Sequence, residues 1–143
     1  MTTTPTRLIE RFYLEVWNTG NELVARQILH PDFVFRGSLG PEHNGPEGFI
    51  LYLRAVRKSL PDFICNIQDI VTEGQRAVAR MEFVGTHNGT FYGIAPTGKK
   101  ITWSGAAFFT TDGEQITELW VLGDIDAVKR QLGVQAGGDF TSQ

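Results

Sequence analysis

The sequence has 143 residues, a length that fits one domain with its own hydrophobic core. Apolar residues make up 41% and charged residues 20%, as in ordinary globular proteins, and a net charge of −3 without a basic run argues against a nucleic-acid partner. The N-terminal stretch has no apolar core typical of a secretion signal, and no apolar run is long enough to span a membrane. A cytoplasmic protein without membrane association is therefore expected.

The cysteine and histidine content bears on cofactors. Cys65 is the single cysteine, which excludes an internal disulfide, and its neighbours Phe63, Ile64 and Ile67 indicate a buried thiol rather than a nucleophile. The three histidines do not show the spacing of metal ligands, and no phosphate-binding or dinucleotide-binding motif is present. We expect neither a metal ion nor an organic cofactor.

The first part of the chain reads as mainly helical. Apolar residues from Leu8 to Trp17 recur at helical spacing, and Gly20 is suited to a position just beyond the helix end. Pro46 suits the first position of a later helix. The predicted elements are, in chain order, a helix over 8–17, a helix over 22–29, a strand over 32–37, a loop over 39–48 with Pro46 opening the next helix, and that helix up to residue 60.

The second part reads as hairpin-linked strands. Turn residues at Glu73–Gly74 and Asp112–Gly113 separate apolar segments, and a closing helix from Ile125 to Leu132 ends at Gly133. The predicted strands cover 63–74, 76–87, 99–113 and 114–124, and residues 134–143 are expected to form a loose tail. Helices followed by antiparallel strands predict an α+β fold in which a curved antiparallel sheet wraps the N-terminal helices. One sheet face would pack on the helices, leaving the other free to line a cavity.

Asp124 lies where the last strand meets the closing helix, and two interpretations stay open. Strand alternation places it on the same face as Trp120 and Leu122, so it would point into a cavity lined by that face. An aspartate in an apolar cavity can transfer protons near neutral pH. Aspartate is equally a preferred N-cap residue, and a helix follows at once.

Three further polar residues are candidates for a site. His87, at a strand end, is either a proton carrier or a turn histidine bonded to the backbone. His43 could bind substrate or bond to the backbone before the helix that begins at Pro46. Arg80 could form an ion pair with Glu82, hold an anionic oxygen, or orient Asp124.

Aromatic residues recur through the helices and strands. Most would belong to the core, and a minority lining a pocket would suit a flat or otherwise apolar ligand. The candidates for substrate contact are Tyr13, Phe49, Tyr92, Trp103 and Trp120.

The order of several motifs resembles one family. FYLEVWNTGN, HPDFVFRG, HNGPEGF, GTHNGTFYGIAPTGKK and ITELWVLGDIDAVKRQLG occur in succession from about residue 8 to 133. Together they resemble the SnoaL-like polyketide cyclases (ester cyclases) of the nuclear-transport-factor-2-like superfamily. The resemblance implies a single domain, 1–143, shaped as a cone-like α+β barrel with a deep pocket between the sheet and the helices.

The resemblance also implies a function. In such cyclases an aspartate matching Asp124 acts as acid and base on a carbonyl-bearing apolar substrate, which closes a ring by intramolecular aldol addition without a cofactor. Histidines matching His87 and His43 also occur, and a homodimer is implied. Isomerase, dehydratase or hydrolase chemistry and non-catalytic ligand binding are alternatives, because this fold serves all of them.

Overall fold

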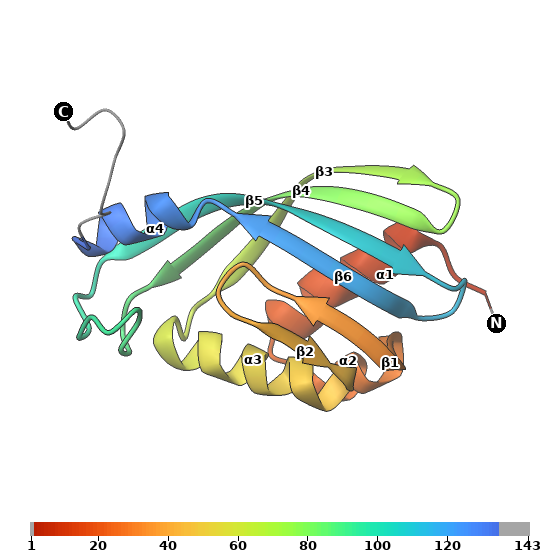
Figure 1. Cartoon of the computed structure of the whole chain (residues 1–143), viewed down its shortest axis with the longest axis horizontal. Coiled ribbons are helices and arrows are strands. Elements are labelled where there is room, and N and C mark those ends of the chain that lie inside the picture. Colours follow the sequence, from red (N-terminus) through yellow and green to blue (C-terminus); the bar gives the residue numbers. More distant parts are fainter. Residues whose placement is uncertain (1, 135–143) are drawn as a thin grey trace.

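The computed structural model describes residues 2–134, which form helices packed against one sheet (Figure 1). The predicted tail lies outside the described residues, apart from Val134. The helical elements are α1 (Pro5–Glu10), the π-helical η1 (Arg11–Trp17), α2 (Glu22–Ile28), α3 (Gly45–Ser59) and α4 (Ile125–Leu132). The strands are β1 (Leu29–Arg36), β2 (Glu42–Asn44), β3 (Ile64–Glu73), β4 (Arg76–Thr86), β5 (Lys100–Thr111) and β6 (Ile116–Gly123).

The six strands form one curved sheet in the order β2-β1-β6-β5-β4-β3. Neighbouring strands are antiparallel except β1 and β6, which run parallel, with Arg36 opposite Trp120. The α+β prediction is confirmed, but two details were wrong. The sheet is not wholly antiparallel, and residues 42–44, expected within a loop, pair with β1.

The N-terminal helical stretch changes character along its length. Thr4 caps α1 by accepting a hydrogen bond from Arg7 N at 3.1 Å, as expected for a threonine in that position. From residue 11 the turns widen, and Asn18 N donates to Tyr13 O, five residues back, at 2.9 Å. The wider turn broadens the buried face of η1, so that Tyr13 is buried with the residues predicted from regular helical spacing.

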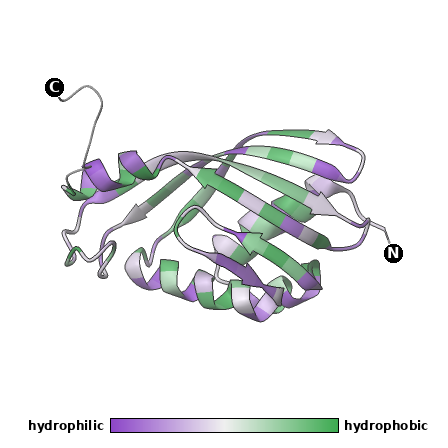
Figure 2. Cartoon of the chain, in the orientation of Figure 1, coloured by the Kyte–Doolittle hydropathy of each residue, from purple (hydrophilic) through white to green (hydrophobic). Residues whose placement is uncertain are grey.

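The concave face of the sheet holds the core, whereas the outer face is open to solvent. Apolar and polar residues alternate along the strands (Figure 2), and on β6 Leu119 and Val121 point inward. On the outer face Phe108, Trp120 and Leu122 keep 42%, 42% and 55% of their surface exposed. Helices and cavity thus share one face, and the expectation that they would occupy opposite faces was wrong.

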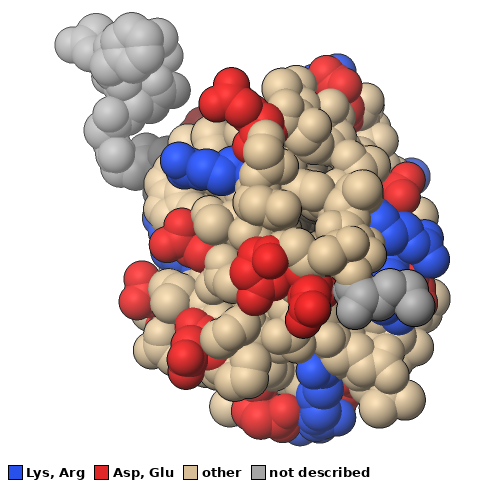
Figure 3. Space-filling model, turned by 90° about the vertical axis from the view of Figure 1, so that its right-hand side faces the viewer, with Lys and Arg blue, Asp and Glu red and all other residues tan. Residues whose placement is uncertain are grey.

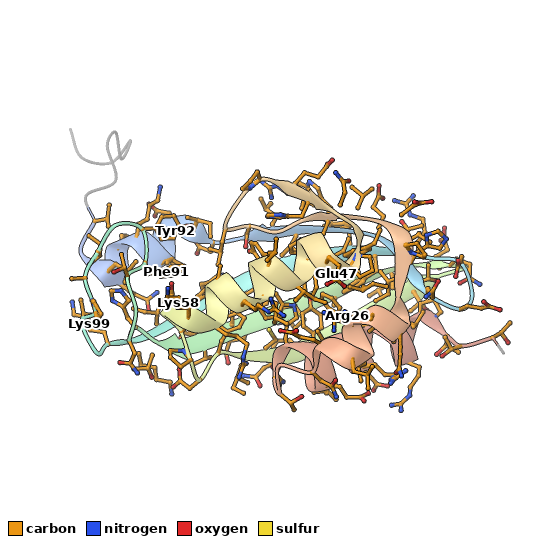
Figure 4. All side chains as sticks on the ribbon, turned by 90° about the horizontal axis from the view of Figure 1, so that it is seen from below. Arg26, Glu47, Lys58, Phe91, Tyr92 and Lys99 are labelled. Atoms are coloured by element: carbon orange, nitrogen blue, oxygen red, sulfur yellow. The ribbon has the colours of Figure 1, made fainter. Side chains whose placement is uncertain are left out.

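Charged side chains of both signs are interspersed at the end of the molecule seen in Figure 3. An ion-paired group joins α2 to α3: Arg26 binds Glu47 at 2.8 Å, and Arg54 binds Glu22 at 2.6 Å. Figure 4 shows Arg26 and Glu47 side by side between these helices. Such exposed pairs contribute little stability each, but they fix how α2 and α3 lie against each other.

Candidate functional site

A mainly aromatic pocket lies between η1, α3 and the concave face of the sheet; we term it the inner pocket. Its cavity volume is about 30 Å³. It is lined by Phe12, Tyr13, Trp17, Phe35, Gly37, Ser38, Leu39, Tyr52, Val56, Phe63, Phe83, Trp103, Leu119 and Val121. This lining suits an apolar ligand that carries few polar groups.

The indole nitrogen of Trp103 is the polar group that distinguishes this pocket. Trp103 is 3% exposed, and among residues 2–134 its Nε1 is the single fully buried side-chain nitrogen or oxygen without a hydrogen-bond partner. A buried donor left unpaired costs about 1–3 kcal/mol. An apolar pocket with one unpaired N–H group is therefore prepared for a ligand that supplies an acceptor.

Glycine at position 123 gives access to that N–H group. A Cβ atom at Gly123 would lie 3.2 Å from Trp103 Nε1 and 2.7 Å from Ser38 Oγ. Any larger residue would therefore cover the indole nitrogen or displace Ser38. The Ser38 hydroxyl and the indole N–H group thus lie close together at one end of the inner pocket.

Two phenols complete the polar contribution to the pocket. Burial raises the pKa of Tyr13 well above its usual value, with smaller contributions from nearby Cys65 and Tyr52. Burial also raises the pKa of Tyr52, whose hydroxyl accepts a hydrogen bond from Leu39 N at 3.2 Å. Both phenols stay neutral at physiological pH, so they can exchange hydrogen bonds but do not act as bases.

Asp124 is a helix cap and does not line the pocket. Its side chain is exposed and accepts a hydrogen bond from Ala127 N at 3.1 Å, as in the N-cap interpretation. The prediction that its face of β6 lines the cavity was wrong, because the inward positions are Leu119 and Val121. Asp124 nevertheless follows Gly123 directly, which places it next to the Trp103 end of the pocket.

His87 is fully buried, but it belongs to the loop between β4 and β5 and not to the inner pocket. Its Nδ1 accepts a hydrogen bond from Thr97 N at 3.2 Å, and its Nε2 lies 3.2 Å from Ile94 O. With Nδ1 as acceptor, Nε2 is the donor. Both ring nitrogens are engaged in holding residues 94–97, so the structure favours the backbone-bonded interpretation.

The other predicted residues divide between pocket, core and surface. Tyr13 and Trp103 line the inner pocket, and Phe49 is a fully buried core residue. Arg80 and Trp120 lie on the outer face of the sheet, where the Arg36 guanidinium stacks 5.3 Å from the centre of the Trp120 ring. These two positions cannot contact a ligand in the inner pocket.

His43 and Tyr92 lie outside the inner pocket. His43 is on β2, with its ring 5.6 Å from that of Tyr52, and it faces the surface beside α3. Tyr92 is 38% exposed and packs under the Lys129 amine at 5.5 Å. Ser38, Leu39 and Tyr52, which do line the pocket, were missed.

The described part of the chain has neither a candidate metal site nor a candidate membrane-spanning helix. Residues 2–134 contain no cluster of three or more histidine, cysteine or carboxylate side chains able to hold a metal ion. Among the helices described, none is long and apolar enough to cross a membrane.

Comparison with known proteins agrees with this architecture of a cone-shaped α+β fold. The family model of the SnoaL-like polyketide cyclases matches residues 7–132, so the chain belongs to this family. A search of curated proteins gave no match.

Solved structures with the same fold cover nearly the whole chain. A proposed SnoaL-like polyketide cyclase from Jannaschia sp. CCS1 is 21% identical, with a TM-score of 0.84 over 94% of this chain and 95% of that one, a likeness that shows the fold alone. IdmH from Streptomyces antibioticus, a proposed polyketide cyclase, is 26% identical, with a TM-score of 0.81 over 92% and 100%. A proposed polyketide cyclase from Bacillus cereus ATCC 10987 is 30% identical, with a TM-score of 0.76 over 92% and 82%.

Proposed function

We propose that this protein closes a ring in a small, mainly apolar compound that carries at least three carbonyl groups, by intramolecular aldol addition in which the attacked carbonyl lies in the inner pocket. The observation that carries the proposal is the unpaired Trp103 N–H group in an otherwise apolar site. Membership of the SnoaL-like polyketide cyclase family supports the same reaction class. The aromatic lining would fold the flexible substrate so that its reacting carbons meet.

The chemistry assigned to Trp103 is stabilisation of developing charge. A base removes a proton from a carbon between two carbonyls, and the resulting enolate carbon attacks a third carbonyl carbon further along the same molecule. As the new C–C bond forms, that carbonyl oxygen gains negative charge and finally takes up a proton, so the product is an isomer of the substrate. The Trp103 N–H group would donate to this oxygen, where a hydrogen bond in an apolar site has its largest effect.

Proton transfer requires a group from outside the pocket lining, because the described residues that line the inner pocket include no carboxylate and no imidazole. Asp124 is the nearest candidate along the chain, since it follows Gly123 at the Trp103 end of the pocket. To act as the base it would have to release its bond to Ala127 N. We assign proton transfer to Asp124 within this proposal.

The experiment separates the two roles. Linear β-keto esters that also carry an aryl ketone are incubated with the protein in D₂O, and NMR follows both deuterium uptake at the acidic carbon and the appearance of ring-closed product. Trp103→Phe keeps the ring but removes the donor, and it should lower kcat/KM by roughly tenfold to a hundredfold, as for a bond to a charged group. Asp124→Asn preserves the cap and should abolish deuterium uptake. Wild-type rates of both readouts in both variants would refute the proposal.

A ligand-binding module without catalysis is the second candidate. It is favoured by the same absence of an acid or base among the pocket-lining residues and by the cap role of Asp124. In that case aryl ketones bind with a response at Trp103, while Asp124→Asn changes neither binding nor deuterium uptake. The D₂O experiment therefore distinguishes the two candidates directly.

We also propose that two copies of the chain pair through the outer face of the sheet. Phe108 and Trp120 stack edge to face there, with ring centres 5.7 Å apart, and Leu122 extends the apolar surface beside them. Exposed apolar side chains on adjacent strands favour burial against an identical face. Light scattering should give the mass of a dimer and, for Leu122→Glu, that of a monomer; a monomeric wild type would refute this assembly.

A further inference from the structure

The inner pocket is too small for the ligand it is built to attract. Its 30 Å³ holds one or two water molecules, whereas ligand sites usually enclose about 300–1,000 Å³. A second hollow, here termed the outer groove, has about 300 Å³ and is open to solvent. The outer groove is lined by Leu39, Gly40, Pro41, His43, Leu51, Tyr52, Ala55, Val56, Ser59 and Phe91.

The two hollows are separated by a thin partition. Leu39, Tyr52 and Val56 line both, so each of these side chains has the inner pocket on one side and the outer groove on the other. The hydrogen bond from Leu39 N to Tyr52 Oη, 3.2 Å long, joins the first two residues of this partition. Displacement of Leu39 would therefore remove one of the three side chains that separate the hollows.

The wall formed by residues 37–41 is the part suited to move. This segment links β1 to β2, it contains Gly37 and Gly40, and the bond from Leu39 to Tyr52 ties it to α3. Glycines permit the backbone rotations that such a displacement needs. A Cβ atom at Gly37 would lie 2.5 Å from Tyr52 Oη, so this backbone packs directly on the phenol.

The opposite wall of the outer groove is fixed. Asn88 N and Gly89 N both donate to Ser59 O, at 3.1 and 3.0 Å, and Ser59 Oγ donates to Thr90 O at 2.7 Å. These bonds tie the start of the β4–β5 loop to the end of α3 and set Phe91 beside that helix (Figure 4). One wall is thus pinned by three hydrogen bonds and the facing wall is held to α3 by one.

We infer that the inner pocket and the outer groove are two parts of one binding site for an elongated, flat, mainly apolar ketone. The carbonyl end reaches the Trp103 N–H group, and the rest of the molecule lies in the outer groove between α3 and Phe91 once Leu39 has moved aside. The ligand class rests on the proposed function, but the shape of the site rests on the shared lining residues. A ketone with two linked rings would extend through both parts of the site, whereas a ketone of a few atoms, such as acetone, would occupy only the inner part.

Binding of two ketones tests the inference without any turnover. Acetone is the short probe and 4-acetylbiphenyl the long one, and the ¹H–¹⁵N signal of the Trp103 indole, assigned with Trp103→Phe, reports binding. Ala55→Phe places a ring in the outer groove from an exposed position of α3, and Lys58→Phe adds the same ring on that helix outside the groove. We expect Ala55→Phe to weaken the binding of 4-acetylbiphenyl at least tenfold and to leave the binding of acetone within twofold, with neither affected by Lys58→Phe. An equal effect on both ketones, no effect, or failure of 4-acetylbiphenyl to bind the wild type would overturn the inference.

Hydrogen exchange of the Trp103 indole tests the partition without any ligand. Leu39→Ala should raise the exchange rate at least tenfold, because it removes the side chain between the inner pocket and solvent. Leu51 lines the outer groove but not the inner pocket, so Leu51→Ala should leave the exchange rate unchanged. Thermal unfolding checks that both variants are folded. Equal exchange in all three proteins would overturn the role of Leu39. Absence of ring closure with these results intact would refute the proposed reaction and leave the binding site standing.

Discussion

Gly123 faces the indole nitrogen of Trp103, so closely that a Cβ atom at position 123 would be 3.2 Å from Nε1. Gly123 ends β6 and Trp103 lies on the adjacent β5. The access of a ligand to the unpaired N–H group therefore depends on the smallest residue being at position 123.

Gly123→Ala should consequently weaken the binding of aryl ketones by roughly threefold to tenfold, which is the contribution of one neutral hydrogen bond. The added methyl group also meets Ser38 Oγ, so Ser38 must shift, and Ser38→Gly relieves that contact. Calorimetric titration with 4-acetylbiphenyl compares Gly123→Ala alone and combined with Ser38→Gly. Recovery of affinity in the double variant would mean that Ser38, and not the covered indole, causes the loss.

Asp124 gives a prediction about stability that holds whether or not it transfers protons. Asp124→Ala removes the acceptor for Ala127 N and should lower the free energy of unfolding by about 1 kcal/mol, whereas Asp124→Asn should lower it by less than half of that. Urea denaturation followed by circular dichroism measures both. A neutral effect of Asp124→Ala would contradict the cap assignment.

Asp62 predicts a pH dependence of stability. Hydrogen bonds from the Thr86 hydroxyl and amide, 2.7 and 2.6 Å long, lower the pKa of Asp62 below its ordinary value of 3.8. Because the folded-state pKa is the lower one, the contribution is fully present above about pH 4 and is lost as the pH falls through the folded-state value. Solvent exposure keeps it to about 1 kcal/mol or less.

The corresponding measurement compares unfolding free energies of wild type and Asp62→Ala between pH 7 and pH 2. Their difference should be constant above pH 5 and shrink toward pH 2. Thr86→Val, which removes the hydroxyl and keeps the amide, should show a smaller difference with the same pH dependence. A difference that grows on acidification would show that another group dominates.

Cys65 should be chemically inert in the folded protein. Full burial raises the pKa of its thiol well above the usual value, which suppresses the reactive thiolate. A thiol reagent such as dithionitrobenzoate should label no cysteine under native conditions and one per chain in guanidinium chloride. Rapid native labelling would indicate that β3, which carries Cys65, opens readily at the sheet edge.

The sequence predicted most elements of the fold because their signals are local. The turns at Gly74 and Gly113 and the helix from Ile125 to Leu132 depend on glycine and capping preferences of short segments. The parallel pairing of β1 with β6 was missed, because it joins strands about 80 residues apart and leaves no local pattern. Residues 42–44 were taken as loop for the same reason, since only their pairing with β1 makes them a strand.

The candidate site was harder to predict because both faces of β6 are apolar. Alternation separates Trp120 and Leu122 from Leu119 and Val121, but it does not say which pair faces inward. We predicted that Trp120 contacts substrate, yet its ring lies on the outer face beneath Arg36. One local signal could have located this part of the pocket. Gly37 and Ser38 are small residues, and they allow the backbone after β1 to approach the pocket closely.

The parallel pairing of β1 with β6 has a consequence for how the protein folds. Because β1 and β6 are parallel, their C-terminal ends lie side by side. Ser38, which follows β1, therefore lies close to Gly123 at the end of β6, although the two residues are 85 positions apart in the chain. Contacts of such long range form late, because much of the intervening chain must be ordered first. The rim of the pocket is thus among the last features to assemble, and a nascent chain that still lacks β6 has no ligand site. Binding of an aryl ketone would therefore report completion of folding, and excess ligand would act as a pharmacological chaperone that traps the finished molecule.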